Sequence, residues 1–285
     1  MRIGAHVSAA GGADKTIPRA VEIGAEAIQF FPSSTRSWRF NPIDERVAAD
    51  FKALALEHEI GPNAFHAVYM VSLPSEDPEL VRKSIQSLVS YMNTASDLGV
   101  MGVIFHLNSH KGRGFDAVFR QVVENMNRVL DNSPSDTMLI IENSAGMGDH
   151  IGSKFSEIGP ILKAVDDKRV GVCLDTQHAF AAGYDLRTPE GVGRTMGEFD
   201  AEIGLDHLVA VHCNDSKREL GEGVDRHENI GEGFMGRAAF ESVLAAAAFR
   251  DVPFYLEVPG YEGGGPDAAN VGTLKAIREE LAIEA

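Results

Sequence analysis

Short apolar runs recur along the chain, and each is followed by a longer amphipathic stretch. Runs of this length predict buried strands, and the amphipathic stretches between them predict helices. The runs that predict strands lie at residues 3–7, 27–31, 63–66, 102–106, 138–142, 170–175, 208–212 and 254–258.

Proline and glycine mark several of the expected helix boundaries. Pro78 suits a first helical turn, and Gly61 and Gly99 stand where helices are expected to stop. The run at 63–66 is the weakest strand candidate, because it is short and directly follows Pro62. The clearest predicted helices cover residues 43–58, 78–98, 115–130, 153–165 and 188–203.

Alternating strands and helices predict a protein of the α/β class. Eight such strands favour a single (β/α)8 TIM barrel, which we expect to span residues 1–285 as one domain. An open doubly wound sheet is the alternative arrangement of the same elements. The segment after the first strand reads GAHVSAAGG, which does not match the G-x-G-x-x-G fingerprint of dinucleotide-binding sheets of that kind.

The composition narrows the class of protein further. No apolar run approaches the roughly 18–20 residues that a membrane span needs, and the first residues lack the apolar segment of a signal peptide. Cys173 and Cys213 cannot make a disulfide framework, so we expect a cytoplasmic protein with no membrane contact. The formal net charge of −16 opposes general affinity for nucleic acid, so any DNA binding must depend on a local site.

Ionisable residues occupy the carboxyl ends of most predicted strands. The C-terminal rim of a barrel carries the chemistry of this fold, so these side chains are expected to converge there. Carboxylates packed together repel one another unless a cation lies between them, and the sequence therefore predicts a metal site at the rim. The strand-end residues are His66, His106, Glu142, Asp175, His212 and Glu257.

Three further candidates follow those strands. His178 lies three residues after Asp175, in what we expect to be a loop. Asp225 and His227 alternate, so an extended loop would point both side chains the same way. Nitrogen and oxygen ligands without a required thiolate fit Zn²⁺ or Mn²⁺, and the total exceeds what one ion uses, so two or three ions are expected. Sites with several metals suit phosphoryl chemistry.

Several long segments resemble the endonuclease IV family of metal-dependent apurinic/apyrimidinic endonucleases. The resemblance extends from IGAHVSAAGG at 3–12 to LEVPG at 256–260. Its most specific segments are IIENSAGMG at 140–148, VCLDTQHAFAAGYDL at 172–186, VHCNDSK at 211–217 and DRHENIGEGFMG at 225–236.

The resemblance implies a xylose-isomerase-like TIM barrel with about three zinc ions, one of which Mn²⁺ could replace. It implies one zinc at His66, His106 and Glu142, and a second at Glu142, Asp175, His212 and Glu257. The third would lie at His178, Asp225 and His227.

The implied activity is hydrolysis of the phosphodiester 5′ to an abasic site in double-stranded DNA, leaving a 3′-hydroxyl and a 5′-deoxyribose phosphate. Blocked 3′ ends are further substrates of the family. Glu142 and Glu257 are the implied catalytic residues, and Arg36 and Tyr69 are implied to enter the DNA beside the damaged nucleotide. We expect the protein to act as a monomer.

Three loops depart from the family pattern, and two other function classes remain open. The departing loops read PSSTRSW, HAVYMVSLPS and FHLNSH; the third lacks the usual Pro-Gly. A sugar isomerase or epimerase of the related barrels would use one metal held by Glu142, Asp175, His212 and Glu257 alone, leaving five candidate ligands surplus. A noncatalytic metal-binding or DNA-recognition module is the other alternative, and the negative charge weakens it.

Overall fold

The barrel strands are parallel and lie side by side in a closed ring. The computed structural model describes residues 1–35 and 37–284. Within that part of the chain the ring runs β1-β10-β7-β6-β5-β4-β3-β2, which excludes the open doubly wound sheet. Its strands are β1 Ile3–His6, β2 Ile28–Phe30, β3 Ala64–His66, β4 Gly102–His106, β5 Met138–Glu142, β6 Val170–Asp175, β7 Leu208–His212 and β10 Phe254–Leu256.

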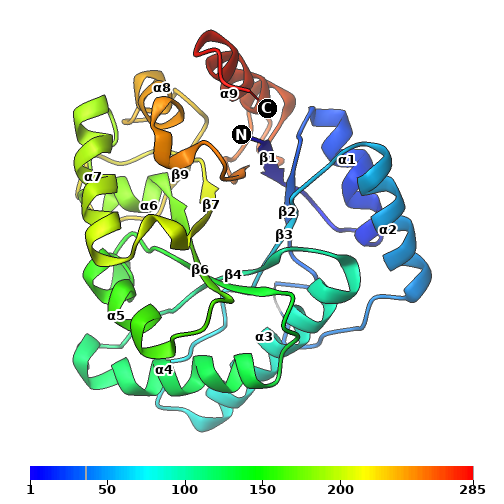
Figure 1. The fold of residues 1–285 in the computed structure, drawn as a ribbon, viewed down its shortest axis with the longest axis vertical. Coiled ribbons are helices and arrows are strands. Elements are labelled where there is room, and N and C mark those ends of the chain that lie inside the picture. The colour runs from blue at the N-terminus through cyan, green and yellow to red at the C-terminus, as the bar shows by residue number, and fades with distance from the viewer. Residues whose placement is uncertain (36, 285) are drawn as a thin grey trace.

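Helices form an outer layer around this ring (Figure 1). Several begin at a side chain that accepts a hydrogen bond from a free backbone N–H of the first turn, as Asp77 does from Glu79 and Thr188 from Gly191. None of the described helices is long and apolar enough to span a membrane. The helices are α1 Thr16–Ile23, α2 Glu45–Glu57, α3 Pro78–Leu98, α4 Phe115–Asp131, α5 Phe155–Val165, α6 Thr176–Ala181, α7 Pro189–Glu202, α8 Arg237–Ala245 and α9 Ala268–Glu280.

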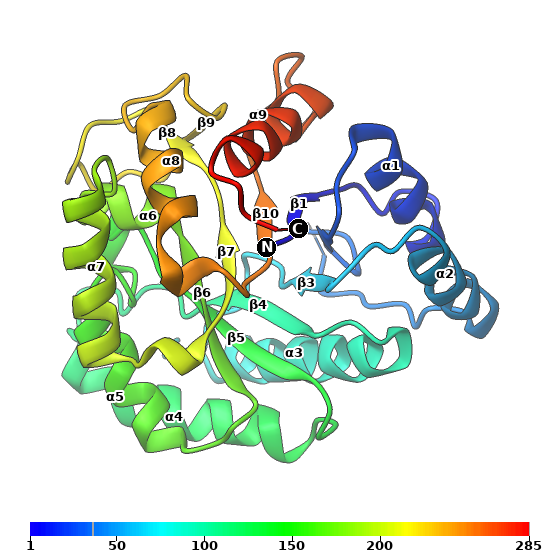
Figure 2. The same ribbon diagram turned by 45° about the horizontal axis from the view of Figure 1, so that its top comes forward.

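A small antiparallel sheet stands outside the ring. It pairs β8 Asp215–Ser216 with β9 His227–Glu228, and both views show it beside α8 (Figure 2). The buried carboxylate of Asp215 accepts backbone N–H groups from Gly231, Gly233, Met235 and Gly236, at 3.0 to 3.2 Å. Asp215 therefore ties the segment that follows β9 to the end of the barrel.

Alternation along the strands fills the barrel and sets the floor of the site. Inward-facing apolar residues form one buried cluster inside the ring. Side chains two positions further along a strand point to the same face. They form the next layer, toward the C-terminal rim. The cluster consists of Ala27, Ala64, Ile104, Ile140, Cys173, Ala210 and Tyr255.

Candidate metal centre

The predicted strand-end residues share one position relative to that apolar floor. Each lies two residues beyond a floor residue of its own strand, as Glu142 lies beyond Ile140. The ring therefore brings the six predicted side chains together above the floor. Their ligand atoms fall into groups in which all atoms lie within 4.8 Å of one another, a spacing that could hold a metal ion.

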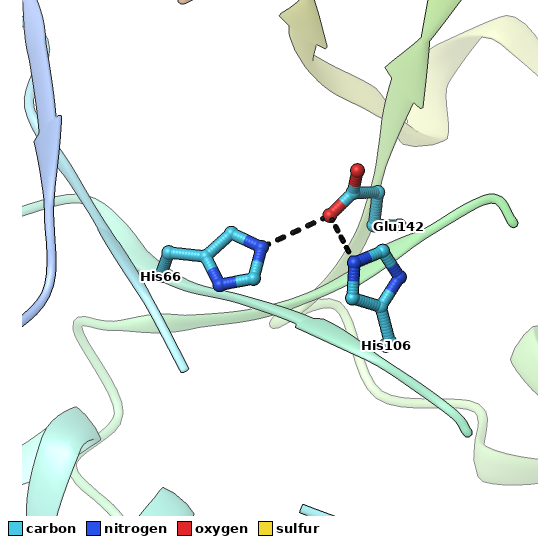
Figure 3. A group of neighbouring side chains, drawn as sticks. All are labelled: His66, His106 and Glu142. Carbon is cyan, nitrogen blue, oxygen red and sulfur yellow. Dashed lines mark hydrogen bonds and ion pairs between the residues drawn. The ribbon is translucent and has the colours of Figure 1, made fainter. Parts of the chain in front are cut away.

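The first group joins His66, His106 and Glu142 (Figure 3). Glu142 Oε2 lies 3.1 Å from His66 Nε2 and 3.2 Å from His106 Nε2. The Nδ1–H of His66 donates to the carbonyl oxygen of Ala67 at 2.7 Å. That bond places the proton on Nδ1 and leaves the lone pair of Nε2 facing the group, as metal-ligating histidines require.

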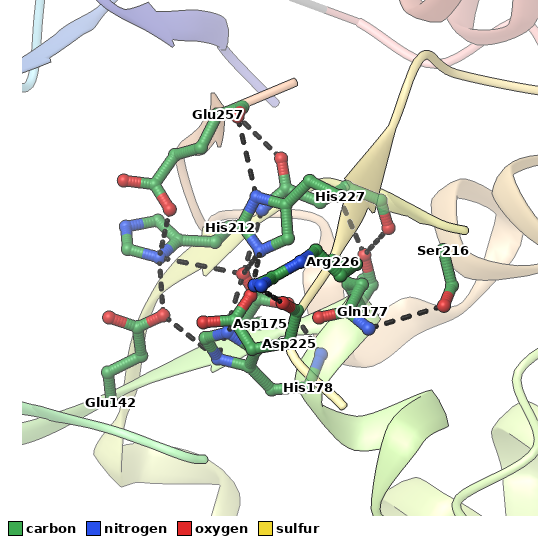
Figure 4. A network of polar contacts seen from close by, with 12 residues as sticks. Glu142, Asp175, Gln177, His178, His212, Ser216, Asp225, Arg226, His227 and Glu257 are labelled. Atoms are coloured by element: carbon green, nitrogen blue, oxygen red, sulfur yellow. Dashed lines mark hydrogen bonds and ion pairs between the residues drawn. The ribbon is translucent and has the colours of Figure 1, made fainter. Parts of the chain in front are cut away.

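The second group joins Glu142, Asp175, His212 and Glu257 (Figure 4). His212 Nδ1 lies 2.9 Å from Glu142 Oε1, 3.4 Å from Glu257 Oε2 and 3.8 Å from Asp175 Oδ2. His212, Glu142 and Asp175 are fully buried. Glu142 therefore contributes one oxygen to each of the first two groups.

The third group joins Asp175, His178 and His227, and Asp225 lies against both histidines. Asp225 Oδ1 is 3.4 Å from His178 Nε2 and 3.3 Å from His227 Nε2. The expectation that His178 lies in a loop is wrong, because it stands on helix α6. The Asp175 carboxylate caps this helix by accepting the backbone N–H of His178 at 2.7 Å, so the helix begins as soon as the strand ends.

Two ring nitrogens in this third group lack hydrogen bonds. Among the residues described, the buried His178 Nε2 and His227 Nε2 have no hydrogen-bond partner, and both face Asp225. The other nitrogen of His178, Nδ1, donates to the carbonyl oxygen of Asn143 at 3.0 Å. Buried polar atoms without partners are rare in proteins. A cation between Asp225 and the two rings would satisfy both nitrogens, so the residues present fit a metal ion.

The carboxylates also draw positive charge onto the site. Burial would raise the pKa of Glu142, but the neighbouring His106, His212 and His178 hold that pKa well below its ordinary value. Burial likewise opposes the charged form of His178, yet Asp175, Asp225 and Glu142 raise its pKa well above the ordinary value. The negative charge of the buried carboxylates can therefore be balanced either by protonated histidines or by bound cations. A divalent ion at this position would replace the histidine proton.

Sequence reasoning missed three buried amides that support these carboxylates. Asn143 Oδ1 accepts the backbone N–H of Asp175 at 2.6 Å. Asn214 Nδ2 donates to Asp175 Oδ2, and its Oδ1 accepts the N–H of Glu257, both at 2.7 Å. Gln29 Nε2 donates to Glu257 Oε1 at 2.7 Å. Two signals were available: Asn143 and Asn214 closely follow strands that end in ligands, and Gln29 lies two positions beyond the floor residue Ala27.

Tyr69 is the exposed aromatic residue above the first group. Its side chain is 59% exposed, and its ring stacks at 22° over His106, with 6.2 Å between centroids. Tyr69, His106, Met147, His178 and Asp225 are among the residues that line a cavity of about 80 Å³ at this point. A larger cavity of about 720 Å³, beside Lys163, is lined by none of the nine candidate ligands. Arg36, the other predicted DNA contact, lies outside the described residues.

Comparisons with known proteins agree with this architecture. Residues 17–282 match the family model described as xylose isomerase-like TIM barrel. A probable endonuclease 4 from Methanoculleus marisnigri is 38% identical over 279 residues, which cover 97% of this chain and 98% of that protein. The crystal structure of endonuclease IV from Thermus thermophilus matches with a TM-score of 0.86 and 34% identity, covering 98% of this chain and 100% of that one. The 3-keto-D-glucoside 4-epimerase YcjR from E. coli, at 14% identity and a TM-score of 0.71, shares the fold.

Proposed function

The chain belongs to the endonuclease IV family of xylose isomerase-like TIM barrels, and we propose that it is a DNA-repair hydrolase acting at abasic sites. It cleaves the phosphodiester 5′ to the abasic nucleotide of a DNA duplex, leaving a 3′-hydroxyl and a 5′-deoxyribose phosphate. The observation that carries this proposal is the third group of ligands. An epimerase needs only Glu142, Asp175, His212 and Glu257, and has no use for His178, Asp225 and His227.

We assign a divalent ion to each group. His66, His106 and Glu142 would hold one, while Asp175, His212 and Glu257 would hold a second together with Glu142. His178, Asp225 and His227 would hold the third. Histidine nitrogens and carboxylate oxygens favour about three zinc ions, with Mn²⁺ able to replace zinc at one position. Bound ions supply positive charge to the scissile phosphate and lower the pKa of a nearby water.

The chain's own residues order the reaction around that phosphate. Glu257 is anchored through Oε1 by Gln29, and it orients the attacking water, whose proton leaves as the nucleophile forms. The water oxygen forms a bond to phosphorus, and the bond from phosphorus to the 3′-oxygen breaks. The departing 3′-oxygen takes up a proton and becomes the 3′-hydroxyl. Glu142, fully buried between two groups, keeps them in fixed relative positions.

Recognition of the lesion depends on side chains at the rim. Tyr69 projects above the first group and is exposed enough to enter a duplex. Extruding a nucleotide costs a few kcal/mol, and least where the base is already missing. Tyr69 and Arg36 occupy the gap that extrusion leaves. The same site accepts blocked 3′ ends, and one copy of the chain acts alone.

Incubation of purified, zinc-loaded protein with an abasic duplex and a matched undamaged duplex tests the proposal. We expect a single cut at the lesion and none in the control. The 3′ end released should be extended by a DNA polymerase without further processing, because it carries a hydroxyl. Absence of cleavage, together with interconversion of a ketose and its epimer, would instead establish the epimerase.

A further inference from the structure

Gln29 is a buried polar residue in an otherwise apolar strand. It lies in β2 between Ile28 and Phe30, and its side chain is fully buried. Because Gln29 lies two positions beyond Ala27, it points into the barrel at the level of the candidate ligands. A buried amide with unpaired groups would destabilise the fold, so its partners matter.

Both polar atoms of the Gln29 side chain contact the candidate metal centre. Nε2 donates to Glu257 Oε1 at 2.7 Å and lies 3.0 Å from His6 Nδ1. Oε1 lies 2.6 Å from His212 Nε2. The amide therefore links two ligands of the second group with a histidine on β1.

The orientation of the amide follows from its neighbours. A carbonyl oxygen facing the Glu257 carboxylate would be repelled, so the amide nitrogen must lie on that side. Its second hydrogen then faces His6 Nδ1 at 3.0 Å, and this nitrogen accepts it in the tautomer that carries the ring proton on Nε2. Oε1 is left to face His212, and an amide oxygen can only accept a hydrogen bond.

His212 must consequently carry a hydrogen on Nε2. Its Nδ1 is then the nitrogen available to a ligand, and this atom faces Glu142, Asp175 and Glu257. The same amide donates a hydrogen bond to Oε1 of Glu257, so Oε2 is the oxygen available to a metal ion. Oε2 lies 3.4 Å from His212 Nδ1.

We propose that Gln29 is a positioning residue that fixes the ring nitrogen His212 presents and the carboxylate oxygen Glu257 presents to the second metal. The proposal rests on the ligand assignment made above. Partners that hold metal-ligating residues in place typically contribute about 10- to 100-fold to metal affinity. Gln29 does so for two ligands through a single side chain.

Zinc affinity of the Gln29→Met protein is the first test. Methionine keeps the length of the side chain but can neither donate as an amide nor accept strongly, so we expect zinc to bind about 10- to 100-fold more weakly at one position. Asn125→Leu is the matched control: it removes another buried amide, whose Nδ2 donates to Leu73, away from the candidate ligands. Equal zinc affinity in the native and Gln29→Met proteins, or an equal loss in Asn125→Leu, would overturn the role of Gln29.

Nitrogen-15 NMR of the zinc-loaded protein shows directly which ring nitrogen of His212 carries the hydrogen. The native protein should show a slowly exchanging Nε2–H resonance from His212, and Gln29→Met should lose it. Gln29→Glu keeps an acceptor for this hydrogen and should retain the resonance; its loss there would contradict the proposal. Native protein that binds no zinc at all would instead overturn the proposed function on which this inference rests.

Discussion

Glu142 shows how one residue can serve two neighbouring groups. Its Oε2 faces His66 and His106, while its Oε1 faces His212 at 2.9 Å. The side chain is fully buried, so the orientation is set by these contacts and not by solvent. Asp225 differs, because its side chain is 46% exposed and contacts the histidines of the third group. The exposed member is therefore the one that can be changed with least effect on the barrel.

Replacing Asp225 with alanine tests the third group. We expect the Asp225→Ala protein to lose about one bound ion and to cleave abasic DNA roughly 10²- to 10³-fold more slowly, the scale for losing a major electrostatic contact. Thermal unfolding should remain cooperative, since the barrel floor does not include this residue. Glu222→Ala, an exposed change in the same segment, should alter neither quantity. Full cleavage by Asp225→Ala would reject the three-metal assignment.

Tyr69 can be changed without replacing a candidate ligand. Tyr69→Ala should lower cleavage of the abasic duplex by about 10- to 100-fold, because contacts between an aromatic ring and nucleobases contribute about 1–3 kcal/mol. Metal content should be unchanged. Tyr69→Phe keeps the ring and should retain most of the activity. If Tyr69→Ala cleaved at the native rate, the role of Tyr69 would be only to pack against His66 and His106.

At the scale of elements, the loops after β3, β4 and β5 are fastened to one another. Asn108 adopts a left-handed backbone, with φ of 72°, and its Nδ2 donates to the carbonyl oxygen of Val71 at 2.9 Å. The backbone of Asn108 also accepts the N–H of Ile151, and Ser109 Oγ donates to Gly148. The loop that carries Tyr69 is therefore held by the loop that follows β4.

The substitution Asn108→Gly tests the hydrogen bond by which the Asn108 side chain holds the loop that carries Tyr69. Glycine accepts the left-handed backbone without strain, so only the side-chain hydrogen bonds are lost. We expect weaker binding of abasic DNA with unchanged metal content. In a Tyr69→Ala background the same substitution should have little further effect, because the Asn108 hydrogen bond affects DNA binding only by positioning Tyr69. Additive losses in the double variant would show that Asn108 acts elsewhere.

Helix α9 is joined to the first strand by a charged contact. Glu26 accepts hydrogen bonds from Arg278 at 2.6 and 2.8 Å and from the backbone of Ile3 at 2.9 Å. Although burial opposes it, these partners lower the pKa of Glu26 to about 2. A lowered folded-state pKa stabilises the protein above the unfolded value of 4.5, and the contribution disappears as pH falls toward 2.

Unfolding by urea at several pH values measures this contribution. Glu26→Gln should lower the free energy of unfolding by about 2 kcal/mol at pH 7, the scale of hydrogen bonds to a charged group. The difference between native and variant should shrink as the pH is lowered from 5 toward 2. Glu279→Gln, an exposed change on helix α9 beside Arg278, is the control. A difference independent of pH would contradict this account.

The sequence predicted strands well and short local elements poorly. Each predicted strand is present to within two residues at either end, because a buried parallel strand is apolar along most of its length. Helix α6 has only six residues, too few to show a helical pattern of apolar positions in the sequence. Its start depends on the Asp175 cap. The pair β8 and β9 depends on the buried Asp215, whose partners are distant in sequence. Gln29 was missed because glutamine is not among the usual metal ligands.

Across the whole molecule, the negative net charge opposes DNA binding, whereas the candidate metal centre must bind DNA. The chain carries a formal charge of −16, which repels a DNA backbone at long range. Four carboxylates, those of Glu142, Asp175, Asp225 and Glu257, are gathered at the rim where the duplex must approach. About three divalent ions would add roughly six positive charges at that point. Metal binding is therefore expected to determine DNA affinity as well as catalysis.

The three-metal assignment fixes the number of ions that full activity requires. Metal-free protein should be reconstituted with increasing zinc, and the ions bound per chain should be measured by elemental analysis beside the rate of abasic-site cleavage. We predict that the rate reaches its maximum only when about three ions are bound. Full cleavage with a single ion per chain would contradict the account.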